Sequence, residues 1–380
     1  MADQDNILVL NSGSSSLKFG LYTRGEREEE VVLNGSAKGI GRENGAIEVR
    51  SAAGEQLALQ AHDLESQHDA LTKLAEIVKK HMRVEPVAVG HRIVHGGPYL
   101  RDHQPITTAV MEKLERARHF APLHIPPALT LIRQAQQTFP NALHIACFDT
   151  AFHRTLPDVA ARFPLPARYS EQGVIRYGFH GLSYESLVHR LGPDLPRRAV
   201  LAHLGNGCSL AAVFDGKSID TSMGLTPTGG VPMSTRAGDL DPGVLLYLWR
   251  SEHLGIDALE ELLNRRSGLA GFSGGEGDMQ ALLSRAATKD NAAELAVSAF
   301  CAAVRKCVGA YAALMGGIDL LVFTGGIGEH SDEIRRRICQ GLGFLGLDNN
   351  RVRVMRSDEE GQIARHCRAL IGTTPSAALP

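Results

Sequence analysis

The chain has 380 residues, of which 43% are hydrophobic, and a formal net charge of -2. Its length exceeds the size at which a single hydrophobic core usually stops growing, so we expect two domains. The nearly balanced, intermixed charge gives no reason to expect a nucleic acid or a membrane surface as a partner.

The opening segment, the apolar runs and the cysteines all bear on the cellular location. The acidic opening segment, 1–5, has no apolar core behind it, so we expect no signal peptide. No apolar run approaches the roughly 20 residues of a membrane helix. The six cysteines include no CxxC pair, which indicates free thiols in a reducing cytosol. We therefore expect a cytoplasmic protein.

The first predicted element is an apolar strand, 7–10, that runs into a turn of small polar residues, 11–16. The same device recurs where 199–202 enters the turn 203–209 and where 318–323 enters 324–329. Glycine lets the backbone approach a ligand closely, and successive N–H groups in such a turn form a concave anion site. Three such turns indicate a polyphosphate held between two related halves, as in a nucleotide-dependent phosphotransferase.

Strands and helices alternate along the rest of the chain. Short strands after residue 17 predict an antiparallel meander, and helical spacing predicts helices over 67–81 and 293–315, the second ended by Gly316. Ser331 is predicted to cap a further helix. This order predicts an α/β protein, with a domain boundary near 148–150.

Two charged residues follow apolar strands, where α/β folds often place functional groups. Arg92, beside glycines, presents a rigid fork suited to a carboxylate or a phosphate; the alternative is a structural arginine bound to backbone carbonyls. Asp149 suits Mg²⁺ binding or the orientation of an attacking oxygen, and a simple helix cap is the competing interpretation.

Three loops complete the candidate set. The proline-rich segment 121–127 is predicted to be a shaped loop. His180, held between glycines in 177–181, is a candidate for contacting a transferring phosphoryl group, although a lone histidine is more often structural. The long segment 220–239 is rich in turn residues, and its Arg236 offers a second guanidinium to the reaction centre.

Taken together, these segments resemble the acetate kinase family, in order from residue 7 to about 347. The carrying motifs are Asn11 to Phe19, His91 to Gly97, Ala121 to His124, Phe148 to His153, Tyr177 to Gly181, His203 to Gly207, Asp220 to Pro227, Thr235 to Asp239 and Phe323 to Glu329. The resemblance implies two related domains of the sugar kinase/actin (ribonuclease H-like) type, with mixed sheets flanked by helices and the active site in the interdomain cleft. The implied domains are 1–149, on which 365–380 packs, and 150–364.

The resemblance also implies a reaction, a homodimer and a set of residue roles. ATP, with Mg²⁺, would phosphorylate acetate reversibly by direct in-line transfer. Arg92 would hold the substrate carboxylate, and the residues around the methyl group would be Val94, Leu123, Phe179 and Pro227. Asp149 would be the catalytic acid–base or metal-positioning carboxylate, His180 and Arg236 would stabilise the transition state, and Asn11 would help to bind Mg²⁺. The implied nucleotide contacts are Lys18, His203, Leu204, Gly205, Asn206, Gly207, Asp278, Met279, Gln280, Gly326, Ile327, Gly328, Glu329 and His330.

The chemistry supports this reaction independently. A carboxylate is already nucleophilic at neutral pH, so no strong general base is needed. Its charge opposes attack on a polyphosphate, so paired arginines and Mg²⁺ are needed to offset the repulsion. On this argument Asp149 serves the metal or the geometry rather than accepting a proton.

Three departures from the family pattern carry expectations. Met279 and Gln280 follow Asp278 where the family usually has an arginine near the base, so the choice between ATP and GTP stays open. His330 stands where the family usually has asparagine. The family's C-terminal stretch carries a glutamate that helps to bind Mg²⁺, whereas the tail 371–380 has no carboxylate side chain and the usual terminal helix is expected to be missing. We therefore expect weaker Mg²⁺ binding.

Alternative functions remain at this point. Propionate is the nearest alternative substrate, because one methylene changes pocket discrimination by only ~1–3 kcal/mol. The altered tail permits a nucleotide-binding regulator with weakened catalysis, although a pure switch has no need of a carboxylate-directed arginine. A sugar kinase is disfavoured, because the small apolar pocket leaves no cluster of groups for many hydroxyls.

Overall fold

The computed structural model describes residues 5–12, 16–26, 28–41, 45–62, 64–81, 85–348 and 350–373. The chain divides into two compact units, one built from Met1–Ala151 and Asp358–Pro380 and the other from Phe152–Ser357. The C-terminal segment therefore joins the first unit from Asp358 onwards, seven residues before the start that we expected. Residues 13–15 of the first turn and 374–380 of the tail lie outside the described residues.

A mixed sheet forms the centre of the first unit, with the strand order β5-β4-β3-β2-β1-β6-β8-β7 in the described residues. Strands β1 to β5 make the expected antiparallel meander, and β1, β6 and β8 run parallel. The elements are β1 (Ile7–Ser12), β2 (Ser16–Arg24), β3 (Glu29–Lys38), β4 (Gly45–Ser51), β5 (Gln56–His62), α1 (Gln67–His81), β6 (Ala88–Ile93), β7 (Gln104–Pro105), α2 (Thr108–Arg116), a 3-10 turn (Ala117–Phe120), α3 (Ile125–Thr138), β8 (Leu143–Phe148) and α14 (Glu359–Thr373).

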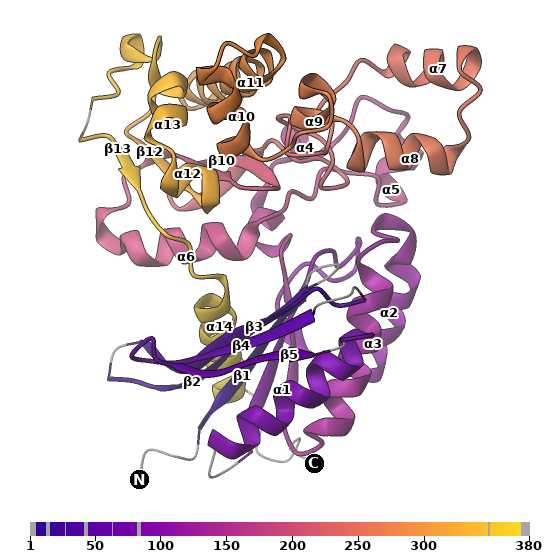
Figure 1. Ribbon diagram of the computed structural model, residues 1–380, viewed down its shortest axis with the longest axis vertical. Coiled ribbons are helices and arrows are strands. Elements are labelled where there is room, and N and C mark those ends of the chain that lie inside the picture. Colours follow the sequence, from indigo (N-terminus) through magenta and orange to yellow (C-terminus); the bar gives the residue numbers. More distant parts are fainter. Residues whose placement is uncertain are drawn as a thin grey trace. The chain divides into compact units, whose positions relative to one another are not determined.

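Helices cover both faces of this sheet (Figure 1). Leu8, Leu10 and Val89 share a core cluster with apolar residues of α1 and α3. On the other face, a Cβ built on Gly90 would lie 2.4 Å from the side chain of Ile363, so α14 packs directly on β6 there. Successive strand side chains point to opposite faces. Arg92, two residues after Gly90, is therefore on the face that α14 covers.

A smaller mixed sheet forms the centre of the second unit, with the order β11-β10-β9-β12-β13. Apolar residues of α6 pack on one face, and α11 packs on β9 and β10. The elements are a 3-10 turn (Ala151–Thr155), α4 (Asp158–Ala161), α5 (Ala167–Glu171), α6 (Gly181–Leu191), a 3-10 turn (Gly192–Asp194), β9 (Arg198–Leu204), β10 (Cys208–Phe214), β11 (Lys217–Thr221), α7 (Pro242–Ser251), α8 (Ile256–Arg265), α9 (Gly268–Ser273), α10 (Met279–Ala287), α11 (Asn291–Met315), β12 (Leu320–Thr324), α12 (Gly325–His330), α13 (Asp332–Cys339), a 3-10 turn (Gly343–Leu345) and β13 (Val352–Val354).

The two sheets share one topology. The orders β3-β2-β1-β6-β8 and β11-β10-β9-β12-β13 correspond strand by strand, and in both sheets the first two pairings are antiparallel and the last two parallel. In both, the hairpin of the first two strands of the unit carries the small-residue turn. The expected α/β fold with two related domains is therefore confirmed.

Several predicted elements agree with the structure, and others differ. α1 spans the predicted residues, α11 ends at a Gly316 with φ +68°, and the Ser331 side chain caps α13. The predicted loop at 121–127 is wrong at its end, because α3 begins at Ile125. Its prolines occupy the first turn, where a missing N–H costs nothing.

The expectation that no apolar run approaches membrane-spanning length is also corrected. α11 has 25 residues and is long and apolar enough to cross a membrane by length and composition alone. Many of its apolar residues, among them Phe300, Val304 and Val308, are buried, although Leu295 and Leu314 are exposed, and the helix packs on β9, β10 and neighbouring helices. α11 is therefore placed as a core helix of the second unit.

Candidate active site

Three predicted residues meet at one edge of the first unit's sheet. Because β1, β6 and β8 run parallel, their carboxyl ends lie at the same edge. Asn11 lies near the end of β1, Arg92 near the end of β6, and Asp149 directly after β8. Lys18 is the cross-strand neighbour of Asn11 on β2, and its side chain is exposed.

The Arg92 guanidinium bonds to two side chains at this edge. Its Nε donates to Asp149 Oδ2 at 2.9 Å, its Nη2 donates to the same oxygen, and its Nη1 donates to Asn11 Oδ1 at 3.1 Å. Asp149 is 1% exposed, whereas Arg92 is partly accessible. The bonds that Arg92 makes here are therefore to side chains rather than to backbone carbonyls, and they give Asp149 an ion-pair partner.

Arg92 is expected to stay protonated. Burial opposes the positive charge, but the carboxylates of Asp149, Glu359 and Glu360 outweigh it and raise the pKa of Arg92 above its usual value. Arg92 is therefore a permanent cation at the sheet edge, partly neutralised by one buried carboxylate.

The C-terminal helix contradicts the expected loss of a carboxylate there. α14 begins at this edge with Glu359 and Glu360, and Asn11 Nδ2 donates to Glu360 Oε1 at 2.7 Å and to Glu359 Oε2 at 3.3 Å. We placed the corresponding stretch at 371–380, of which 374–380 lie outside the described residues. The terminal helix is present, and the grounds for weaker Mg²⁺ binding are removed. The sequence signal that we missed is the acidic pair in the helix's first turn.

The second unit brings two of the glycine turns together. β9 and β12 run parallel, with Thr324 beside His203, so the turns that follow them leave the same edge of the sheet. A Cβ built on Gly205 would lie 3.8 Å from the backbone N of Gly326. The third turn is helical: α12 begins at Gly325, whose φ is +78°, and a Cβ built on Gly325 would lie 2.7 Å from the Leu204 carbonyl oxygen, so the site leaves no room for a side chain.

The residues of the α12 turn face different surroundings. Glu329 folds back on the turn, its Oε1 accepting from Gly325 N at 3.0 Å and from Thr324 Oγ1 at 3.1 Å. Gly328 is buried, Ile327 is partly buried, and Gly326 and His330 are exposed.

His180 and Arg236 converge beside the other glycine turn. His180 adopts a left-handed backbone conformation, φ 58°, at the start of α6. A Cβ built on Gly207 would lie 3.3 Å from His180 Nε2 and 3.4 Å from Arg236 Nη1. Arg236 Nη1 also donates to the Pro227 carbonyl at 3.2 Å, and the His180 ring stacks on that of His203 with centroids 4.2 Å apart.

The remaining nucleotide candidates of this unit connect to the same turn. Asp278 caps α10, accepting from Ala281 N at 2.9 Å, with Met279 buried and Gln280 exposed behind it. Ser234 ties the start of α10 to the turn: its Oγ donates to the Gly277 carbonyl at 2.7 Å and its N to the Asn206 carbonyl at 3.3 Å.

The four candidates for the methyl pocket are split between the units. Val94 and Leu123 belong to the first unit, with Val94 partly buried and Leu123 46% exposed. Pro227 and Phe179 belong to the second; Phe179 is buried, and its carbonyl accepts from His153 Nε2 at 3.1 Å.

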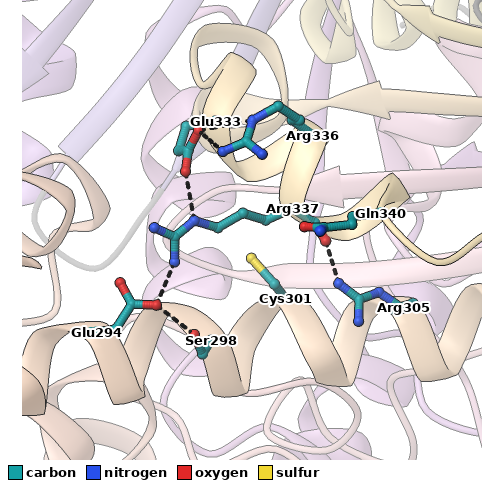
Figure 2. Close-up of a pocket in the computed structure, with 8 residues that line it drawn as sticks. All are labelled: Glu294, Ser298, Cys301, Arg305, Glu333, Arg336, Arg337 and Gln340. Carbon is teal, nitrogen blue, oxygen red and sulfur yellow. Dashed lines mark hydrogen bonds and ion pairs between the residues drawn. The ribbon is translucent and has the colours of Figure 1, made fainter.

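A charged pocket of about 380 Å³ lies between α11 and α13 (Figure 2). Arg337 spans it, with Nη1 donating to Glu294 and Nε to Glu333, both at 2.7 Å. Arg305 Nε donates to the Ile338 carbonyl at 3.1 Å. Arg305 and Arg337 therefore already bond to a carbonyl and to carboxylates. We call the bonds from Arg337 to Glu294 and Glu333 the brace, because they connect α13 to α11.

The brace supports the α12 turn. α13 follows α12 after a single residue, and Arg335 of α13 donates to the carbonyls of Gly328 at 2.6 Å and Glu329 at 3.0 Å. The Arg337 bonds hold α13 on α11, so they also fix the end of the glycine turn.

Comparisons with known proteins agree over nearly the whole chain. Residues 6–371 match the family described as the Acetokinase family. The acetate kinase of Methylocella silvestris is 38% identical over 410 residues, covering 98% of this chain and 99% of that protein. The propionate kinase of Citrobacter rodentium is 40% identical, covering 98% of each.

Solved structures give the same result. The acetate kinase of Porphyromonas gingivalis matches with a TM-score of 0.86 and 33% identity, covering 97% of this chain and all of that chain. A propionate kinase from Francisella tularensis matches with a TM-score of 0.89 and 35% identity over the same shares.

Proposed function

This chain belongs to the acetokinase family, and we propose on that premise that it transfers a phosphoryl group reversibly from ATP to acetate, giving acetyl phosphate and ADP. The observation that carries the proposal is the partly accessible Arg92 guanidinium, oriented by Asp149 and Asn11 at the carboxyl edge of the sheet. A planar fork held in this way suits the carboxylate of a small acid.

We assign the recognition of the acid to the substrate residues that the resemblance implies. Arg92 binds the carboxylate, and the apolar residues Val94, Leu123, Phe179 and Pro227 surround the methyl group. The acetate carboxylate is itself the nucleophile, so no group has to remove a proton from it. Asp149, buried and ion-paired, orients Arg92 and serves the metal in place of a general base.

We assign the phosphoryl transition state to His180 and Arg236. Both present nitrogen atoms to the space over Gly207. Charge on the equatorial oxygens of a loose transition state is stabilised by donors that are already in place. Preorganisation of this kind lowers the barrier without reorganisation during the reaction.

We assign nucleotide binding to the two turns that leave the second sheet and to the start of α10. His203 to Gly207 and Gly326 to His330 supply backbone and side-chain contacts, Asp278 to Gln280 lie at the base, and Lys18 of the first unit contacts the nucleotide. Gln280 is exposed where the family usually has arginine near the base, so the choice between ATP and GTP is left to measurement.

We propose Mg²⁺ as the cofactor, because the donor set of the first unit fits a hard cation. Asn11 offers an amide oxygen, and Glu359, Glu360 and Asp149 offer carboxylates within one hydrogen-bonded cluster. Mg²⁺, when bound, neutralises phosphate charge and orients the transferring group. The acidic pair also removes the reason to consider a catalytically weakened regulator.

Propionate is the second candidate substrate, because named propionate kinases are as similar to this chain as acetate kinases are. One additional methylene alters discrimination by only ~1–3 kcal/mol. The preference of this chain between the two acids therefore has to be determined by measuring its relative rates on them.

We also propose a cytoplasmic homodimer. No residue of α7 or α8 is buried, yet these helices carry large apolar side chains, among them Tyr247, Trp249 and Ile256, the last 82% exposed. An exposed apolar face of this kind marks an interaction surface. A second copy of the chain is the occupant that the resemblance implies. None of the six cysteines, all of which are described, forms a disulfide, which fits a reducing compartment.

Trapping of the acyl phosphate as its hydroxamate tests the reaction. Purified protein with Mg·ATP would be offered acetate, propionate, butyrate and glycerol. We expect product with the small acids and no phosphorylation of glycerol. Arg92→Ala should remove product, whereas Arg118→Ala, at an exposed pair with Glu115, should not. Phosphorylation of glycerol, or no acyl phosphate from any acid, would contradict the proposal.

A further inference from the structure

The two ring nitrogens of His180 have different surroundings. Its Nε2 and the Nη1 of Arg236 both lie within 3.4 Å of the position that a Cβ on Gly207 would occupy. Gly207 has no side chain, so no Cβ occupies the position that both nitrogen atoms approach. Nε2 can donate a hydrogen bond to a ligand at that position only if it carries a proton.

The opposite ring nitrogen bonds to a buried pair of hydroxyls. His180 Nδ1 lies 2.8 Å from Ser209 Oγ, and Ser209 Oγ lies 2.6 Å from the Tyr184 hydroxyl. Ser209 and Tyr184 are both 0% exposed. Burial raises the pKa of Tyr184 well above its usual value, so its phenol keeps its proton.

The buried phenol of Tyr184 keeps a proton that needs an acceptor, and Ser209 Oγ is its hydrogen-bond partner at 2.6 Å. When the Tyr184 hydroxyl donates to Ser209 Oγ, the single proton of Ser209 is left to donate to His180 Nδ1. Nδ1 is then an acceptor, and the proton of the neutral ring lies on Nε2.

We propose that Ser209 and Tyr184 are positioning residues that hold His180 as its neutral Nε2–H tautomer, with that N–H directed at the space over Gly207. The inference rests on the proposed phosphoryl transfer, in which this N–H donates to an oxygen of the transferring group. Without the hydroxyl pair the ring can take either tautomer, and one of them turns a lone pair towards that oxygen.

A neighbouring histidine provides a matched control. His203 Nδ1 lies 2.9 Å from the hydroxyl of Ser183, which is also 0% exposed. Ser183→Ala and Ser209→Ala therefore each remove one buried serine hydroxyl from one of two stacked imidazoles. Only Ser209→Ala should change the tautomer of His180.

The first measurement is a long-range ¹H–¹⁵N correlation spectrum of the full-length protein labelled with ¹⁵N-histidine, without ligands. We expect His180 to show a protonated Nε2 and an unprotonated Nδ1. Ser209→Ala should shift these resonances towards a mixture of tautomers, and Ser209→Thr, which restores the hydroxyl, should return them. A protonated Nδ1 in the unaltered protein would overturn the proposal.

The second measurement is the steady-state rate of the same variants. Loss of alignment lowers kcat for acyl phosphate formation between about 10- and 100-fold in Ser209→Ala, with KM values for acid and nucleotide within about twofold. Tyr184→Phe should act in the same direction. Ser209→Ala with unchanged tautomer and unchanged kcat would overturn the inference. The spectrum needs no turnover, so an unaltered protein that makes no acyl phosphate but shows the expected tautomer contradicts the proposed function alone.

Discussion

Glu360 accepts a hydrogen bond of 2.7 Å from the side-chain amide of Asn11, although 349 residues separate them. Asn11 belongs to the first strand of the chain and Glu360 to its last helix. The first unit therefore completes its candidate metal site only when the C-terminal segment has returned to it.

Removal of the Glu360 charge should raise the Mg²⁺ requirement. Carboxylate charge sets much of the affinity for a hard cation, so in Glu360→Gln the Mg²⁺ concentration at half-maximal activity should rise by about tenfold or more. Glu112→Gln, at an exposed position on α2, is the control and should titrate like the unaltered protein. A Glu360→Gln titration that matches the control would exclude the carboxylate from the metal site.

Arg92→Lys should separate charge from geometry. Lysine keeps the positive charge but cannot bond Asp149 and Asn11 with a planar fork. We expect kcat/KM for acetate to fall by about 100-fold, or roughly 2.7 kcal/mol, because lysine cannot make the two-point contact with the acid that the fork makes. Arg133→Lys, at an exposed pair with Glu115, should leave kcat/KM unchanged. Full activity of Arg92→Lys would mean that only the charge matters.

Buried neutral histidines should make the protein less stable in acid. Burial lowers the pKa of His91 and of His144 and lowers the pKa of His153 to about 4. The unfolded chain binds these protons near its usual pKa of ~6.5, so stability is lost as the pH falls below that value. Proton uptake linked to His153 alone should lower the free energy of unfolding by about 2 kcal/mol between roughly pH 8 and pH 5.

Urea unfolding at several pH values checks this expectation. The pH slope of the unfolding free energy should be smaller in His153→Gln than in the unaltered protein. The exposed His253→Gln should keep the original slope. Equal slopes in all three proteins would show that His153 does not stay neutral in the fold.

The charged brace between α11 and α13 should matter for the nucleotide. Arg337→Ala removes both bonds from Arg337 to Glu294 and Glu333, so α13 and the α12 turn before it lose support. We expect a rise in the KM for ATP of about threefold or more, with lower thermal stability. Arg336→Ala removes only an exposed contact with Glu333 and serves as the control. Equal KM values would separate the brace from nucleotide binding.

The apolar face of α7 and α8 should form the contact between two copies. Trp249→Glu places a charge on that face without disturbing a buried core, because the side chain is 59% exposed. We expect the variant to sediment as a monomer at concentrations where the unaltered protein is a dimer. Val159→Glu, at a 90% exposed position elsewhere in the unit, should leave the dimer intact. A monomeric unaltered protein would contradict the homodimer.

The sequence predicted those features that depend on local pattern. Apolar runs followed by Asn11, Arg92 and Asp149 located three strand ends, and the parallel pairing of those strands places the residues at one edge. The repeated strand–turn–strand device predicted two sheets of shared topology. Helical spacing and a glycine stop predicted α11 to within two residues.

The features that the sequence did not predict depend on tertiary contacts. The acidic start of α14 has no local feature in the sequence that connects it to Asn11. The position of the family's C-terminal glutamate was therefore assigned to the tail, 371–380, instead of to Glu359 and Glu360. The segment of α12 has the sequence pattern of a turn because glycine disfavours a helix, and only tertiary structure shows that a Cβ on Gly325 would lie 2.7 Å from the Leu204 carbonyl oxygen at the start of that helix. Ser209 and Tyr184 look like ordinary core residues until the fold places them behind His180.

The most direct test of the account uses acetate labelled with ¹⁸O, Mg·ATP and ³¹P NMR. Attack by the carboxylate predicts an acetyl phosphate resonance shifted by an ¹⁸O in the bridge between carbon and phosphorus, formed together with ADP. ADP and unlabelled inorganic phosphate, without labelled acetyl phosphate, would contradict the transfer to acetate.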